Sequence, residues 1–301
     1  MSSLAKIFSS KRALYYYVQK GIRLVWLRRA LGAALAALVP RRKLVPLDAK
    51  AQQSLAELVR DGVTFPPWAK LPGSTIAHLV AHLRALPVYA LADLRTRSVP
   101  LYVQQPEAMA HSRLYHAPAD VACIPELVGL ANHPQVLALV ARYMGATPTI
   151  VSMQAWWSIG HADAALHLAQ DDMFHRDVDD LRFLKMFMYL TDVGMDNGVH
   201  SFVMQSHQSM QLVRRGPISE MQIHQHFAPA AVASYTGEAG TLFIEDTWGI
   251  HRQSPATAGL RLAFAVIYNL SGLDPNSPPS PVAPLPQGLD PYINRVVFSA
   301  A

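Results

Sequence analysis

The sequence has 301 residues, of which 51% are hydrophobic, and this composition excludes disorder over most of its length. It fits one large domain, or one domain with an added segment. The single cysteine, Cys123, excludes an internal disulfide framework and favours a reducing compartment, so we expect a cytoplasmic protein. The net charge is +5, but residues 1–43 hold ten Lys or Arg and no acid, which leaves 16 basic and 21 acidic side chains elsewhere. An acidic body argues against nucleic-acid binding, which needs a basic face on the fold.

The basic segment, residues 1–43, is predicted to be an amphipathic N-terminal arm that precedes a domain over residues 44–301. Four apolar residues recur at helical spacing and would share one helix face: Leu14, Val18, Ile22 and Val25. Three interpretations stay open: the helix lies on an anionic membrane surface, packs on the domain with its basic residues in solvent, or is an organelle transit peptide. The longest uncharged run, residues 30–40, is about half the length of a membrane-spanning helix. Any membrane contact is therefore expected to be peripheral.

The order of the predicted elements after the arm defines the expected fold class. Helices are predicted first, over residues 48–60, 74–86 and 124–143, the last broken at Asn132-His133-Pro134. Short runs rich in β-branched and aromatic residues then predict strands over 149–157, 184–193, 200–204, 241–244 and 262–270. Helices followed by strands predict an α+β protein with a jelly-roll core and flanking helices.

The segment Phe174-His175-Arg176-Asp177 is the centre of the predicted site. Strand residues two apart point to the same side, so His175 and Asp177 would converge while Arg176 turns away. With His251 as third ligand they would form a two-His-one-carboxylate triad, which leaves open positions on iron(II). Arg261 begins a strongly apolar strand, and an arginine that points into an apolar barrel needs an anion as its partner. A dicarboxylate co-substrate would supply that anion.

Other histidines offer alternatives to this site. His161-Ala162-Asp163 repeats the His-x-Asp spacing, but it follows Gly160 in an alanine-rich loop, and the expected strand and turn follow His175 at the better distance. His224 and His226 form a His-x-His pair that is more typical of a histidine-rich loop than of a metal site. The sequence leaves open whether His167 and His200 line the cavity.

These motifs together resemble the phytanoyl-CoA dioxygenase family. The resemblance covers residues 46–270 and rests on the following parts: the Asp61-Gly62 turn, Phe174–Asp177, Leu184–Val193, the Asp196-Asn197-Gly198 turn, Ser206-His207, His251-Arg252 and Arg261. It implies a double-stranded β-helix fold, iron(II), 2-oxoglutarate and dioxygen. It makes His175, Asp177 and His251 the iron ligands and Arg261 the partner of the distal 2-oxoglutarate carboxylate. It also places Phe187 and Trp156 in the co-substrate pocket.

One departure from the family pattern lies near the predicted site. Met204-Gln205 stands where the family has Pro-Gly before Ser-His, which changes a turn near the site without touching the ligands. The expected activity is an iron(II)- and 2-oxoglutarate-dependent dioxygenase that hydroxylates a small organic or lipid-like substrate and releases succinate and CO2. Related halogenases lack the carboxylate ligand, so the presence of Asp177 favours hydroxylation. The alternatives are a catalytically silent jelly-roll binding protein and a membrane-surface scaffold that acts through its arm.

Overall fold

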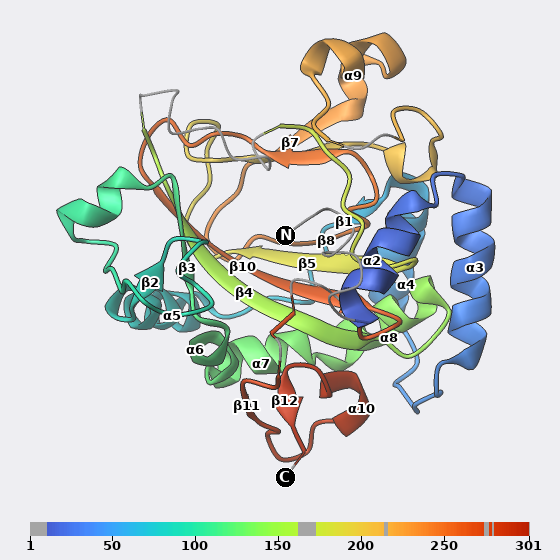
Figure 1. Cartoon of the computed structure of the whole chain (residues 1–301), viewed down its shortest axis with the longest axis horizontal. Coiled ribbons are helices and arrows are strands. Elements are labelled where there is room, and N and C mark those ends of the chain that lie inside the picture. The colour runs from blue at the N-terminus through green and yellow to red at the C-terminus, as the bar shows by residue number, and fades with distance from the viewer. Residues whose placement is uncertain (1–10, 162–172, 214–215, 274–276, 279, 301) are drawn as a thin grey trace.

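Two antiparallel sheets form the centre of the fold in the computed structural model, which describes residues 11–161, 173–213, 216–273, 277–278 and 280–300 (Figure 1). Within these ranges the larger sheet has seven strands in the order β1-β8-β5-β10-β4-β3-β2, and the smaller has three in the order β7-β6-β9. The strands of the larger sheet are β1 (Val63–Thr64), β2 (Val88–Tyr89), β3 (Arg113–His116), β4 (Thr149–Ile159), β5 (Phe183–Tyr189), β8 (Leu242–Glu245) and β10 (Leu260–Asn269). Those of the smaller sheet are β6 (His200–Val203), β7 (Val232–Tyr235) and β9 (His251–Gln253). The strands β11 (Ala283–Pro284) and β12 (Phe298–Ser299) pair in parallel near the C-terminus.

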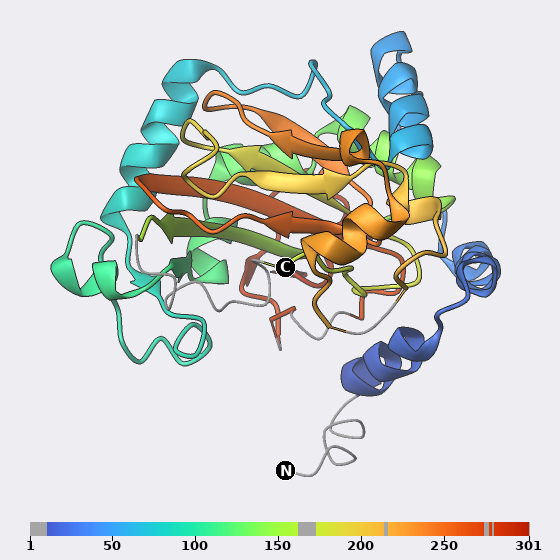
Figure 2. The same cartoon turned by 90° about the horizontal axis from the view of Figure 1, so that it is seen from above.

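The helices lie outside the two sheets, with α9 beside the smaller one (Figure 1). They are α2 (Lys11–Gly21), α3 (Val25–Leu38), α4 (Ala49–Asp61), α5 (Gly73–Ala85), α6 (Pro118–Ala122), α7 (Pro125–Ala131), α8 (Pro134–Met144), α9 (Glu220–His226) and α10 (Pro291–Asn294). Figure 1 shows α6, α7 and α8 on the face of the larger sheet that is turned away from the smaller sheet. Figures 1 and 2 both place α2 and α3 at the opposite end of the sheets from α5. These helices therefore do not cover the face of the larger sheet that is turned toward the smaller sheet.

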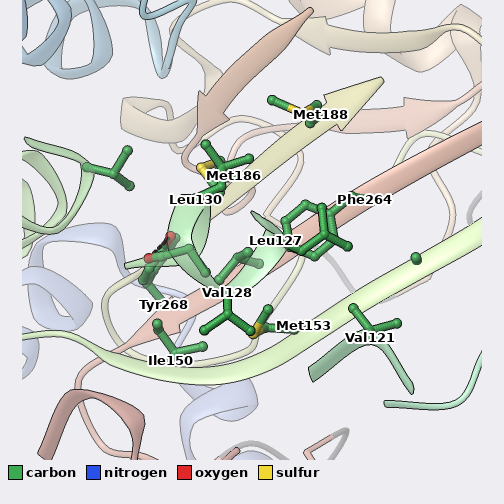
Figure 3. Packing of buried hydrophobic residues seen from close by; sticks show 14 of the residues in the cluster. Val121, Leu127, Val128, Leu130, Ile150, Met153, Met186, Met188, Phe264 and Tyr268 are labelled. Atoms are coloured by element: carbon green, nitrogen blue, oxygen red, sulfur yellow. Dashed lines mark hydrogen bonds between the residues drawn. The ribbon is translucent and has the colours of Figure 1, made fainter. Parts of the chain in front are cut away.

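Alternation along the strands separates the core from this inner face, because successive strand residues point to opposite sides of a sheet. On β5, Met186 and Met188 pack with residues of α7 such as Leu127 and Leu130 (Figure 3). The residues that alternate with them, Lys185, Phe187 and Tyr189, line a cavity on the other face. Strand β10 behaves likewise: Phe264 and Tyr268 belong to the core, whereas Arg261 and Ala263 line the cavity. One face of the larger sheet therefore packs in the hydrophobic core, and its other face lines the cavity.

The strands predicted from the sequence agree with β4, β5, β6, β8 and β10, and the break at residues 132–134 separates α7 from α8 as predicted. The sequence prediction missed β2, β3, β7, β9, β11 and β12. These strands are two to four residues long and carry little alternation, whereas the equally short β6 and β8 lie in runs that were recognised by composition. The α+β class with antiparallel sheets is confirmed.

The arm differs from its predicted form. A single helix continuing to Val25 is wrong, since α2 ends at Gly21 and α3 begins at Val25. The apolar stripe contacts the body only in part: Val18 is 59% exposed, whereas Val25 is 6% and Gln19 is 1% exposed. No helix within the described ranges combines the length and hydropathy needed to span a membrane.

Hydrogen bonds to the segment after the predicted ligands hold the arm on the body. The Tyr15 hydroxyl donates to the Asp180 carboxylate, and Gln19 Nε2 donates to the Val178 carbonyl at 2.9 Å. These polar contacts attach α2, whereas the later part of the arm also buries apolar residues, among them Val25, Ala36 and Val39. A hydrophobic-periodicity argument cannot detect the polar part of this attachment. Of the interpretations of the arm, packing on the domain is the one that the described residues display. The expectation that its basic residues lie in solvent is wrong for Arg28, which is 3% exposed.

We predict that Gly160→Ala destabilises the protein by about 1–3 kcal/mol, because a Cβ at residue 160 would lie 2.2 Å from the backbone carbonyl carbon of Ala258. Urea unfolding measures the change. The matched control is Gly129→Ala, where a Cβ on helix α7 meets nothing within 4 Å, and the better helix propensity of alanine should stabilise by about 0.5–1 kcal/mol. Equal stability of the two variants would contradict the close packing between β4 and β10 at this end of the sheet.

Candidate metal centre

His175, Asp177 and His251 converge as a group of three possible metal ligands, with their donor atoms within 4.8 Å of one another. His175 Nε2 lies 3.6 Å from Asp177 Oδ1, and His251 Nε2 lies 3.2 Å from Asp177 Oδ2. Two ligands at right angles, each ~2.1 Å from an ion, would be ~3 Å apart. The spacing therefore fits three ligands on one face of an octahedral ion, and within the described part of the chain no second group of this kind occurs.

Backbone pairing brings the two histidines together. The His175 amide donates to the His251 carbonyl at 2.9 Å, and the His251 amide donates to the His175 carbonyl at 3.0 Å. The Asp177 amide donates to the carbonyl of Thr247 at 2.9 Å, which extends the contact to the turn before β9. The ligand segment thus forms a short antiparallel ladder with the chain around residue 250.

Each histidine ring is oriented by its second nitrogen. His175 Nδ1 donates to the Met173 carbonyl at 2.8 Å, and His251 Nδ1 donates to the Gly249 carbonyl at 3.1 Å. Nδ1 of each ring therefore carries a proton, and Nε2 is the nitrogen that is turned toward Asp177 and is placed to bind a metal ion. The donor set and its outer hydrogen bonds fit a divalent metal.

Arg176 points away from the ligands, as the strand argument predicts. Its Nη1 donates to the carbonyls of Trp248 at 2.6 Å and Ser206 at 2.9 Å, which ties the ligand segment to two neighbouring loops. Gln205, which precedes Ser206, has φ +63°. A glycine would adopt this left-handed conformation without strain, whereas a glutamine adopts it at a cost.

The remaining predicted site residues line the same cavity as the three ligands. Arg261, Phe187 and Trp156 all lie on its wall, and its volume is about 140 Å³. Arg261 is 2% exposed and donates to the Gly198 carbonyl and to Gln253 Oε1. The structure therefore brings all six predicted residues into one cavity between the two sheets.

Lys185 is a member of the site that the sequence argument missed. Its Nζ lies 2.6 Å from Asp177 Oδ2 and 2.8 Å from Asp179 Oδ2. Burial alone would raise the pKa of Asp177, but Lys185 and the two histidines hold it well below its usual value. Burial alone would lower the pKa of Lys185, but the two carboxylates raise it. Phe187 was predicted to line the pocket, and Lys185 is two residues away on the same strand. This spacing could have identified Lys185, because strand residues two apart point to the same side.

A second buried pair lies beside the histidine ligands. His200 Nε2 lies 3.0 Å from Glu245 Oε2, and the carboxylate group is completely buried. The His200 ring stacks on that of His251, with ring centroids 5.6 Å apart and an interplanar angle of 20°. His200 thus lines the cavity, which the sequence had left open, and it supports a ligand ring from the side.

The alternative histidines do not join the site among the described residues. His161 Nε2 donates to the His111 carbonyl at 2.9 Å and does not line the cavity, while its proposed partner Asp163 lies outside the described residues, as does His167. His224 and His226 are exposed near the end of α9.

Comparisons with known proteins find similarity of structure only. No protein-family model and no curated protein sequence matches the chain. The apo structure of the non-heme monooxygenase ThoJ is 18% identical, with coverage of 82% of this chain and 86% of that chain and a TM-score of 0.50. The alpha-ketoglutarate-dependent epimerase SnoN from nogalamycin biosynthesis is 18% identical over 73% of this chain and 80% of its own, with a TM-score of 0.48. HygX from Streptomyces hygroscopicus, with nickel, 2-oxoglutarate and hygromycin B bound, is 14% identical over 72% and 86%, with a TM-score of 0.47. The likeness to ThoJ indicates a shared fold.

We predict that Lys185→Met lowers the free energy of unfolding of the metal-free protein by about 3–5 kcal/mol, because Asp177 and Asp179 would remain buried without their cation. A divalent metal should recover part of this loss by neutralising Asp177. Urea unfolding with and without metal measures both effects.

The matched control is Lys50→Met, which removes an exposed lysine from α4 and should change stability by less than about 0.5 kcal/mol. If Lys185→Met were as stable as this control, Lys185 would not compensate the buried carboxylates.

Proposed function

We propose that this protein is an iron(II)- and 2-oxoglutarate-dependent dioxygenase built on a double-stranded β-helix core. The observation that carries the proposal is the convergence of His175, Asp177 and His251 in a cavity that also contains Arg261. A two-His-one-carboxylate set with open positions is typical of non-haem iron(II) oxygenases. The shared fold with the non-heme monooxygenase ThoJ supports this choice. Membership of the phytanoyl-CoA dioxygenase family stays a prediction.

The proposed roles follow from position in the cavity. His175, Asp177 and His251 would hold the iron, and Arg261 would pair with the distal carboxylate of 2-oxoglutarate, because a buried guanidinium needs an anion and its planar fork matches a carboxylate. When bound, the iron would couple decarboxylation of 2-oxoglutarate to oxidation of the substrate. Phe187 and Trp156 would exclude water from the co-substrate.

Lys185 would fix the position of Asp177. Its contact with Oδ2 occupies one side of the carboxylate, so the carboxylate is oriented before metal binds. Because Asp177 retains the carboxylate that halogenases lack, we propose hydroxylation of a small organic or lipid-like molecule, with release of succinate and CO2.

Peripheral membrane contact through the arm is a separate proposal. Val18 and Trp26 are 59% and 64% exposed, and the basic arm carries no acid. Exposed apolar side chains beside basic ones suit an anionic lipid surface.

The function is tested by iron(II) binding and by iron-dependent release of succinate from 2-oxoglutarate in air. His175→Ala and His251→Ala should each weaken iron binding at least ~10-fold and abolish succinate release, because each removes one of three ligands. Calorimetry measures the binding, and chromatography measures the succinate.

The matched control is His161→Ala, which removes the histidine of the other His-x-Asp triplet and should retain both properties. Loss of iron binding in His161→Ala with retention in His175→Ala would refute the assignment of the ligands.

A further inference from the structure

A second cavity of about 240 Å³ lies between the arm and the body, away from the cavity of the proposed metal site. Helix α3 forms one wall with Arg28 and Arg29, and Arg182 contributes from the start of β5. Asp246 and Trp248, from the turn between β8 and β9, form the opposite wall. The volume exceeds the ~30 Å³ share of one water molecule several-fold, so it can hold a small polar group.

Arg28 is the buried cation of this cavity. It is 3% exposed, and its guanidinium carbon lies 4.1 Å from the ring centroid of Trp248. Its nitrogens donate to Gln19 and to the backbone carbonyl of Asp180, so its hydrogen-bond partners are uncharged groups. Burial lowers the pKa of Arg28 to about 10. A buried guanidinium with these partners would gain from an anion.

Arg182 and Arg29 add two more cations beside it. Arg182 Nη1 donates to the carbonyl of Met144 at 2.7 Å, and its Nη2 donates to the carbonyl of Arg29 at 3.3 Å. The stem of Arg182 crosses α3 at Gly32, where a Cβ would lie 2.9 Å from its Cγ. The small residue lets the arginine reach the cavity, and the exposed Arg29 lies at its edge.

The carboxylates near the cavity already have other partners. Asp246 Oδ2 accepts from the Tyr143 hydroxyl at 2.6 Å, and its Oδ1 accepts from the Trp248 amide at 3.1 Å. Asp180 accepts from Tyr15 and from backbone amides. Among the residues that the structure describes, Arg28, Arg29 and Arg182 form no ion pair with any carboxylate. The cavity walls therefore carry three guanidinium groups against one carboxylate.

We propose that this cavity is a second anion-binding site, which takes a phosphate group carried by a soluble molecule or by a lipid headgroup. Several guanidiniums around one concavity match the oxygens of a phosphate, which accepts charge-assisted hydrogen bonds from more than one direction. The site adjoins the turn that holds the proposed ligands: Thr247 accepts from the Asp177 amide and Gly249 accepts from His251 Nδ1.

The test is a titration of the full-length, metal-free protein with inorganic phosphate. Calorimetry in a buffer that is otherwise free of phosphate measures the binding. Arg29→Gln and Arg182→Gln should each weaken phosphate binding roughly tenfold, the effect of losing one charge-assisted hydrogen bond. Arg29 is exposed, so its substitution leaves the fold intact even if Arg182→Gln proves unstable. Arg23→Gln is the matched control, since it removes one exposed charge from the same arm outside the cavity.

Vesicles of phosphatidylcholine with and without a phosphoinositide distinguish the two sources of phosphate. Vesicle binding that needs the phosphoinositide and is lost in Arg29→Gln and Arg182→Gln supports the lipid headgroup, whereas binding of inorganic phosphate without vesicle binding supports a soluble ligand. The proposal is overturned if neither probe binds, if the cavity variants bind phosphate like wild type, or if Arg23→Gln weakens binding as much as they do. If phosphate bound only at Arg261, the cavity variants would bind it like wild type.

Discussion

Two backbone hydrogen bonds between His175 and His251 are the contact on which the proposed site depends. They pair two segments that lie far apart in the sequence, and the antiparallel geometry places both rings on one side. Asp177 then reaches the same point, because it is two residues from His175 on an extended chain. The ladder and this two-residue spacing together bring the three donor atoms within 4.8 Å of one another.

Charge is the second constraint on this arrangement. Asp179 and Glu245 are buried and Asp177 is half-buried, so three unpaired carboxylates around this cavity would be strongly destabilising. Lys185 compensates two of them and His200 contacts the third. The same β5 strand that supplies Lys185 also supplies Met186 and Met188 to the core, so the position of this cation is fixed by the packing of the sheet on its helices. The fold and the electrostatics of the site are thus coupled through one strand.

The sequence predicted the convergence of the proposed ligand residues better than it predicted their surroundings. The spacing of His175 and Asp177, together with Arg261 at the start of an apolar strand, was enough because both follow from strand periodicity and from the chemistry of buried charge. Lys185 was missed because a lysine among apolar residues is usually an exposed position, and only the pairing partners of β5 reveal its neighbours. The arm was predicted from its apolar stripe, whereas Tyr15 and Gln19 attach it through contacts across the chain that no local pattern encodes.

The most direct test of the account is an anaerobic titration of the iron(II)-loaded protein with 2-oxoglutarate, followed by visible absorption. The account predicts a weak charge-transfer band that saturates in wild type and that needs at least roughly tenfold more 2-oxoglutarate in Arg261→Gln, because the buried cation proposed to bind the distal carboxylate is lost. Arg142→Gln, which removes an exposed arginine of α8, should titrate like wild type. A folded protein that binds iron(II) at His175, Asp177 and His251 but gives no band at saturating 2-oxoglutarate would contradict the proposed co-substrate and with it the oxygenase function.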